Sequence, residues 1–145
     1  MAKGACGARI VPLLLLAAVA AGAGCRSGPP RIEIAGQQAM ISPAILGVCS
    51  IFLSIANRGD RDDALVGASV EIPGTITQVH DVREGKMVRA ERVVVPAGGA
   101  VELRPGGLHI MVFELPRDVA AGSEMKLHLR FETSGEVVTS VKVRG

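Results

Sequence analysis

Short runs of hydrophobic residues, many of them alternating with polar ones, divide the chain after residue 30 into predicted β-strands. The segment 126–132 is the clearest case, because Leu127, Leu129 and Phe131 would fall on one face of an extended chain. Turns that contain glycine separate the runs, as at Ser134-Gly135. The predicted strands are 31–35, 48–56, 64–70, 75–82, 87–95, 100–103, 109–115, 126–132 and 137–143.

This spacing of short strands and turns predicts one all-β domain, arranged as a sandwich or a barrel. No segment after residue 35 has apolar residues at a sustained helical spacing with capping residues at its ends. Trp and Tyr are absent from the sequence, so we expect a core of Val, Ile and Leu side chains with three Phe residues.

Residues 1–25 have the pattern of an export signal. Lys3 and Arg9 give a positive start, and the following uncharged run is shorter than the roughly 20 residues of a membrane-spanning helix. The run ends in Gly22-Ala23-Gly24-Cys25, which resembles a bacterial lipobox. We therefore expect lipidation of Cys25. The alternative is that the chain is cleaved before this cysteine and carries no lipid.

Export sets the boundaries of the mature protein. We predict a signal peptide at 1–25, a tether at 26–31 and a domain at 32–145, located in the periplasm or otherwise outside the cytoplasm and attached to the membrane through Cys25. Without the signal peptide 14 basic residues face 14 acidic ones, so the mature chain has no basic excess for nucleic-acid binding. A lipid anchor needs no basic patch either.

Cys49 is the one cysteine expected to remain within the folded domain, so an intramolecular disulfide is excluded there. It lies in the apolar run 47–55, which predicts a small core residue in preference to a metal ligand.

Two histidines and two methionines form the candidate functional site: His80, Met87, His109 and Met111. His109 and Met111 are two residues apart in a predicted strand, so both side chains point to the same face, about 7 Å apart at the backbone. The six residues 81–86 would form a hairpin connection, which makes His80 and Met87 candidate cross-strand neighbours. The Pro105-Gly106-Gly107 turn would place His109 at the sheet rim, accessible to a partner. Imidazole and thioether ligands together favour Cu(I) over Mg, Ca or Mn.

The arrangement of these four residues resembles the ligand pattern of the PCu(A)C periplasmic copper chaperones. In that pattern a histidine and a methionine are followed, after twenty-one residues, by His-x-Met, and residues 88–108 supply that spacer. The segment 95–111 is similar to the most recognisable stretch of the family, and the resemblance covers about residues 32–143. The first spacer is six residues long where the family usually has ten.

The resemblance implies a cupredoxin-like Greek-key β-sandwich that carries Cu(I) outside the cytoplasm. It further implies delivery toward the CuA subunit of cytochrome c oxidase, with a Sco-type thioredoxin-like protein as another candidate partner. We expect a monomer that is not an enzyme.

Two alternatives are open at this point. The first is an exported β-sandwich without a metal, acting in adhesion or as a scaffold lipoprotein, for which Arg58-Gly59-Asp60 is a weak indication. The second is an enzyme that pairs a carboxylate such as Glu84 with a histidine, although the carboxylates lie in predicted turns. Among the other candidate ligands, His128 is predicted to face solvent and Met125 to pack. Met40 is predicted to pack or to act as an accessory thioether.

Overall fold

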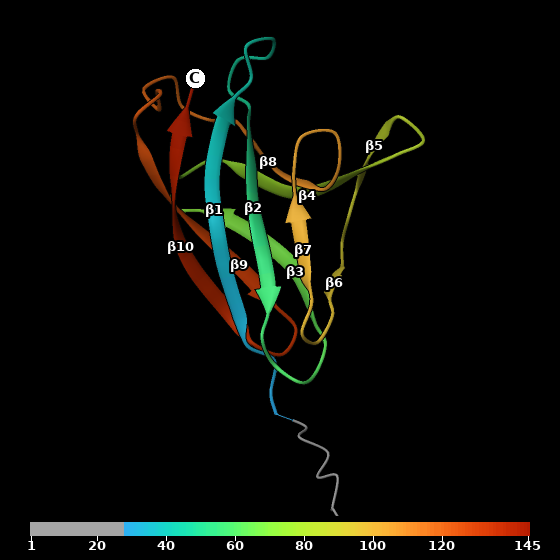
Figure 1. The fold of residues 1–145 in the computed structure, drawn as a ribbon. Helices are drawn as coiled ribbons and strands as arrows, with labels where there is room; N and C mark the ends of the chain where they lie inside the picture. Colours follow the sequence, from blue (N-terminus) through green and yellow to red (C-terminus); the bar gives the residue numbers. More distant parts are fainter. Residues whose placement is uncertain (1–27) are drawn as a thin grey trace, which may run out of the picture.

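The computed structural model describes residues 28–145, which fold into an all-β, cupredoxin-like sandwich (Figure 1). The predicted signal peptide, Cys25 and the first residues of the predicted tether lie outside the described residues. Ten strands are present: β1 (Ile32–Ile41), β2 (Cys49–Asn57), β3 (Asp63–Val70), β4 (Ile76–Arg83), β5 (Lys86–Arg89), β6 (Val93–Val95), β7 (Ala100–Leu103), β8 (His109–Phe113), β9 (Glu124–Phe131) and β10 (Gly135–Arg144). Within this part of the chain there is no helix long and apolar enough to cross a bilayer.

The strands form one curved sheet in the order β5-β4-β8-β2-β1-β10-β9-β3-β6. All neighbours pair antiparallel except β1 and β10, which are parallel. β2 pairs with β8 along its first half and with β7 along its second half. In Figure 1, β1, β2 and β7 lie in front of β3 and β9, so the curved sheet supplies both layers of the sandwich.

The core lies between these layers and consists of aliphatic side chains. The largest fully buried ones are Ile51, Ile55, Leu65, Ile110, Leu127 and Leu129. Phe131 is also buried in this cluster, as the alternation of β9 predicts. Among the described residues the buried core comes from the segment 39–143, so residues 28–145 contain a hydrophobic core of their own.

Two predicted strands differ from those observed. β1 continues to Ile41, six residues beyond the predicted end, because a bulge between Ala35 and Gln38 interrupts the alternation; Gly36 accommodates it with φ +67°. The predicted strand 87–95 is divided into β5 and β6. After β5 the Ala90 N–H donates to Val79 O, 2.8 Å away, and the chain then crosses to pair with β3.

Two buried polar side chains, Asn57 and Asp63, tie together the end of the sandwich at which the described chain begins, and we call this pair the polar clamp. Asn57 Oδ1 accepts from the N–H groups of Arg31 and Gly59, and its Nδ2 donates to Arg61 O and Val95 O. Asp63 accepts from the backbone N–H groups of Ala64, Thr133 and Ser134 and from the Ser134 hydroxyl.

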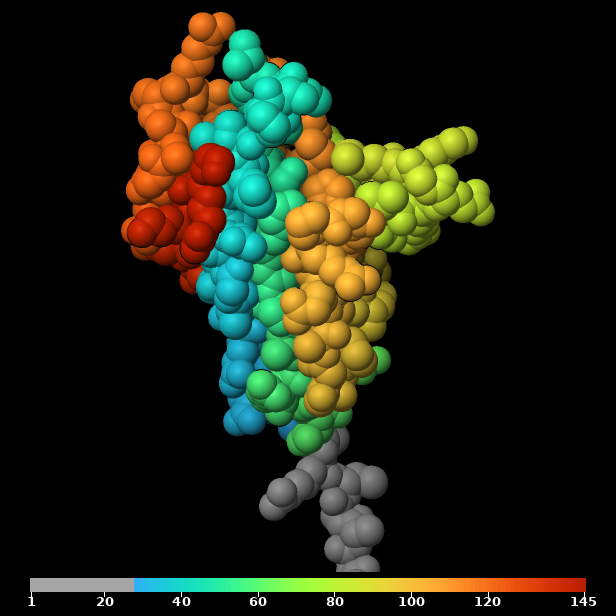
Figure 2. All heavy atoms as spheres, turned by 45° about the horizontal axis from the view of Figure 1, so that its top comes forward, coloured from blue at the N-terminus to red at the C-terminus, as the bar shows by residue number. Residues whose placement is uncertain are grey.

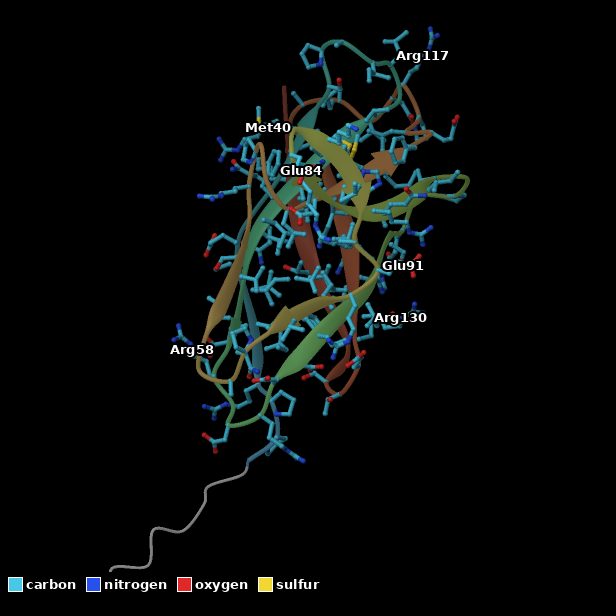
Figure 3. The ribbon with its side chains drawn as sticks, turned by 90° about the vertical axis from the view of Figure 1, so that its right-hand side faces the viewer. Met40, Arg58, Glu84, Glu91, Arg117 and Arg130 are labelled. Atoms are coloured by element: carbon cyan, nitrogen blue, oxygen red, sulfur yellow. The ribbon has the colours of Figure 1, made fainter. Side chains whose placement is uncertain are left out.

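The Arg58-Gly59-Asp60 sequence has a structural role at the same end, where Arg58 is labelled in Figure 3. Arg58 pairs with Glu33, and Asp60 accepts from Gly28 N–H. A side chain at Gly59 would collide with the backbone of residues 29–31, because an added Cβ would lie 2.2 Å from Pro29 O. These contacts hold the entering chain against the turn after β2 and give each of the three residues a structural role.

Candidate metal centre

The β4–β5 hairpin, which carries two of the four candidate ligands, has a tighter turn than predicted. Its connection is Glu84-Gly85, with φ values of +50° and +73°, as in the type I′ turns that match strand twist. Four of the six predicted loop residues therefore belong to strands. His80 pairs with Arg89 and Val82 pairs with Met87, so the two candidate ligands are on adjacent strands, as predicted, but are not directly opposite one another. They are diagonal neighbours on one face of the hairpin.

The register between β4 and β8 brings the remaining ligands to the same face. His80 is directly opposite His109, and Gln78 is directly opposite Met111. Residues opposite one another in an antiparallel pair point to the same side of the sheet. The centroids of the two imidazole rings are 6.1 Å apart and their planes are inclined by 58°. The structure therefore brings all four predicted residues onto one face of the strands β5, β4 and β8.

His109 is buried, with 5% of its surface exposed, and its orientation is fixed by the backbone before β8. Its Nδ1 is 2.7 Å from the carbonyl oxygen of Gly107. A carbonyl can only accept, so Nδ1 carries the hydrogen and Nε2 keeps a free lone pair. The ring of Phe52 on β2 lies beside it, with centroids 6.4 Å apart. His109 therefore presents Nε2 as a candidate ligand atom on a buried ring.

His80 also has one nitrogen with a partner and one without. Its Nε2 is 2.9 Å from Gln78 Oε1, and its Nδ1 is buried with no hydrogen-bond partner among the described residues. Burial, and to a smaller degree the charges of His109 and Arg89, lower the pKa of His80 below its usual value. A neutral ring with a free lone pair is the state that a metal ion requires. The donor set therefore fits a metal ion.

The two thioethers differ in exposure. Met111 is buried, with 8% of its surface exposed, whereas Met87 on β5 is 53% exposed. β5 belongs to a hairpin that projects from the body of the sandwich, which is visible as an arm in Figure 2. The start of the strand was predicted to be accessible at the sheet rim, but the His109 side chain at that position is buried. Met87 is the exposed member of the group.

The donor chemistry is restricted to histidine and methionine. No group of three or more His, Cys, Asp or Glu residues that could hold a metal ion occurs in residues 28–145. Cys49 is fully buried, and burial raises the pKa of its thiol to about 11. Because Cys49 pairs with Val112, its side chain points to the face opposite Met111. The core role predicted for Cys49 is confirmed, and any metal bound at the four-residue group would need thioether ligands.

The other histidine and methionines lie outside the group. His128 on β9 is bonded to Glu71 at 2.7 Å and to Glu136 at 3.0 Å, so it is less free in solvent than predicted; these hydrogen bonds raise its pKa. Met125 is buried, as predicted. Met40 on β1 shares the face of Met111, but Ser50 lies between them on β2, a separation of about 10 Å at the backbone.

A groove of about 420 Å³ lies where β3 and β4 meet without pairing, and Gln78 and Arg89 form part of its wall. Figure 3 shows Glu91 and Arg130, two other wall residues, on the same flank of the molecule. None of the four candidate ligands lines this groove. The four candidate ligands therefore lie on the sheet face, outside the groove. Gln78 borders the groove and is open to solvent there.

The fold and this face define a class: a cupredoxin-like sandwich with a histidine and methionine cluster in place of a cysteine-containing site. Residues 32–143 match the family described as "Putative lipoprotein LpqE-like", and the chain belongs to that family. A protein of Leifsonia xyli subsp. xyli, named "Putative lipoprotein Lxx21020", is 28% identical over 112 residues, which cover 74% of this chain and 67% of that protein.

Several solved structures share the fold. The apo PCuAC domain from PmoF1 has a TM-score of 0.70 and 24% identity, with coverage of 81% of this chain and 96% of that domain. The copper-bound PCuAC domain from PmoF2 has a TM-score of 0.66 and 22% identity, with coverage of 81% and 95%. The Cu(I) form of DR1885 from Deinococcus radiodurans has a TM-score of 0.61 and 19% identity, with coverage of 77% and 78%. The predicted resemblance to PCu(A)C proteins is confirmed at the level of the fold.

Proposed function

We propose that this domain is an extracytoplasmic copper chaperone that binds one Cu(I) through His80, Met87, His109 and Met111. The observation that carries the proposal is the buried, unpartnered Nδ1 of His80, on the same sheet face as a second histidine and two thioethers. A buried polar atom without a partner costs free energy, and a bound ion would offset that cost. The copper-bound relatives of the same fold support the identity of the ion.

The unequal burial of the ligands supports a role in transfer. His109 and Met111 are buried on a central strand, so they would hold the ion in a fixed place. Met87 is exposed on a projecting hairpin, and a partner's ligand could replace it without disturbing the others. Among the described residues the one cysteine, Cys49, is buried on the opposite face of the sheet, so binding by the neutral ligands of the group would remain reversible.

The test is a competition for Cu(I) between the domain from residue 28 and a coloured Cu(I) chelator under reducing conditions. Wild type should take copper from the chelator at one ion per chain, and His109→Ala and Met111→Leu should each weaken binding by about 10-fold or more. His128→Gln and Met40→Leu are matched controls, because each removes the same type of side chain outside the group. If wild type and all four variants compete equally, the proposed site is wrong and a scaffold or adhesion role gains support.

We further propose that the recipient is a copper-accepting protein, either the CuA subunit of cytochrome c oxidase or a Sco-type thioredoxin-like protein. The basis is the resemblance of the ligand pattern to PCu(A)C chaperones together with the shared fold. Mixing the Cu(I)-loaded domain with either apo acceptor, then separating the two and measuring copper in each, tests this. Retention of all copper by the domain in both mixtures would contradict it.

The proposed attachment to a membrane through a lipid on Cys25 agrees with the lipoprotein description of the family. The described chain begins at one end of the sandwich, and the β4–β5 hairpin projects from the side toward the other end (Figure 1). A lipid at Cys25 would therefore leave the ligand face accessible to partners. Mass spectrometry of the mature N-terminus distinguishes a diacylated Cys25 from a chain cleaved without lipid.

A further inference from the structure

The two candidate histidine ligands are held in different ways. His109 gives its Nδ1 hydrogen to a backbone carbonyl, that of Gly107, whereas His80 makes its one hydrogen bond through Nε2 to a side chain, that of Gln78. The nitrogens left free are therefore different atoms, Nε2 in His109 and Nδ1 in His80. The backbone partner of His109 cannot be changed by a substitution, but the partner of His80 can.

The burial of His80 Nδ1 decides which nitrogen carries the hydrogen. If the hydrogen were on Nδ1, the ring would hold a buried N–H donor without an acceptor, which is the costlier kind of unpaired group. With the hydrogen on Nε2, Gln78 Oε1 accepts it at 2.9 Å and only a lone pair stays unpaired. A lone pair of this kind is what a metal ion uses.

We propose that Gln78 is a positioning residue, which holds His80 in the tautomer with its hydrogen on Nε2 so that Nδ1 faces the copper. This inference rests on the proposed copper function and adds to it a residue and a ligand atom. Gln78 is suited to the role by its place in the sheet, because it lies two residues before His80 on the same face and directly opposite Met111. Gln78 therefore lies among the four candidate ligands on this sheet face.

The choice of a neutral amide has a consequence for affinity. A carboxylate that accepts a hydrogen from a metal-bound imidazole raises the basicity of that ligand, and loss of such a partner typically weakens metal binding by about 10- to 100-fold. An amide oxygen gives the orientation with less of the added basicity. Gln78→Glu should therefore bind Cu(I) more tightly than wild type, and Gln78→Leu should bind about 10-fold more weakly.

The decisive measurement does not require copper. Nitrogen-15 spectra of the apo domain, at a pH where histidines are neutral, identify the protonated nitrogen of each ring. In wild type and Gln78→Glu, His80 should be protonated at Nε2 and His109 at Nδ1. In Gln78→Leu the His80 signals should shift toward a mixture of tautomers, with His109 unchanged. Gln37→Leu is a matched control, because Gln37 makes its side-chain hydrogen bonds to Ile34 and Thr139, away from the ligand face.

The outcomes separate this inference from the proposed function. Protonation of His80 at Nδ1 in wild type, or identical His80 signals in wild type and Gln78→Leu, overturns the role of Gln78 whether or not copper binds. The expected tautomers with no Cu(I) uptake leave the role of Gln78 in place and refute the copper function. On addition of Cu(I), shifts at His80 Nδ1 and His109 Nε2 support both, whereas a shift at His80 Nε2 overturns the proposed ligand atom. Gln78 borders the groove between β3 and β4, so the substitution Gln78→Leu leaves no closed cavity in the core.

Discussion

The polar clamp, Asn57 and Asp63, and the histidine pair, His80 and His109, both place polar side-chain atoms out of solvent, although His80 as a whole is only partly buried, and these atoms are satisfied differently. In the clamp the Asn57 amide makes two hydrogen bonds through each end, and the Asp63 carboxylate accepts four. In the histidine pair each ring makes one hydrogen bond, and His80 Nδ1 is left buried without a partner. Burial alone therefore does not separate a structural polar group from a ligand. The unpaired lone pair does, because a fold that needs the group only for stability would satisfy it.

The clamp should show the largest effect on stability. Asp63→Ala removes the acceptor of three backbone N–H groups and one hydroxyl, all of which lie at the junction of β3 with the turn after β9. Leaving such donors unpaired should lower the free energy of unfolding by about 3 kcal/mol. Urea denaturation of the apo domain measures this, with the exposed Asp118→Ala as a control for loss of a carboxylate. Equal stability of the two variants would show that the clamp is dispensable.

The pKa of Asp63 also indicates that the polar clamp stabilises the fold. Burial alone would raise it, but the hydrogen bonds from Ser134, Thr133 and Ala64 outweigh burial and hold the pKa below its usual value. The ionised carboxylate therefore contributes stability above the unfolded-state pKa, about 3.9, and this contribution is lost as the pH falls through the lower folded-state value.

The histidine pair should respond differently. His80→Phe replaces a ring that has an unpaired buried nitrogen with an apolar ring of similar shape, next to the existing Phe113 ring. We expect the free energy of unfolding to stay within about 1 kcal/mol of wild type or to rise, because the cost of the unpaired atom is removed. His109→Phe is the matched comparison, since it leaves the Gly107 carbonyl unpaired and should destabilise by about 1 kcal/mol. A loss at His80→Phe as large as that at Asp63→Ala would mean that His80 has a structural role.

Sequence patterns predicted the ligand face better than they predicted the contacts around it. The two-residue period placed His109 and Met111 on one face, which the register confirms. The same period places Gln78 beside His80, but a lone glutamine carries no ligand chemistry of its own, so the sequence does not single it out. Nor does the sequence indicate the Glu84-Gly85 turn, because glutamate is an unusual residue at positive φ, where Asn or Asp before Gly is the common signal.

The polar clamp cannot be predicted from the sequence, for a different reason. Asn57 ends β2 and Asp63 begins β3, but the partners of Asp63 are up to 71 residues away in the chain. Only the closure of the sheet brings Thr133 and Ser134 to Asp63. An unpaired atom such as His80 Nδ1 is likewise visible only after every neighbour has been placed.

The smallest expected effect is on the pH dependence of stability. It appears in a comparison of His80 with His128, whose two ring nitrogens both have hydrogen-bond partners. Hydrogen bonds to Glu136 and Glu71 raise the pKa of His128, whereas burial lowers the pKa of His80. The contribution of His128 to stability is therefore complete below the unfolded-state value, about 6.5, and is lost as the pH rises through its raised folded-state pKa. His80 acts in the opposite direction, since stability is lost as the pH falls below about 6.5.

Unfolding free energies of the apo domain between pH 5 and 8, measured for wild type, His128→Gln and His80→Phe, separate the two contributions. His128→Gln should lose the decline on the alkaline side, and His80→Phe should lose the decline on the acidic side. A variant profile parallel to that of wild type would show that the histidine concerned does not change its protonation on unfolding. If both profiles move in the same direction, the contrast between a bonded and an unbonded histidine is wrong, and with it the reason for treating His80 Nδ1 as a ligand atom.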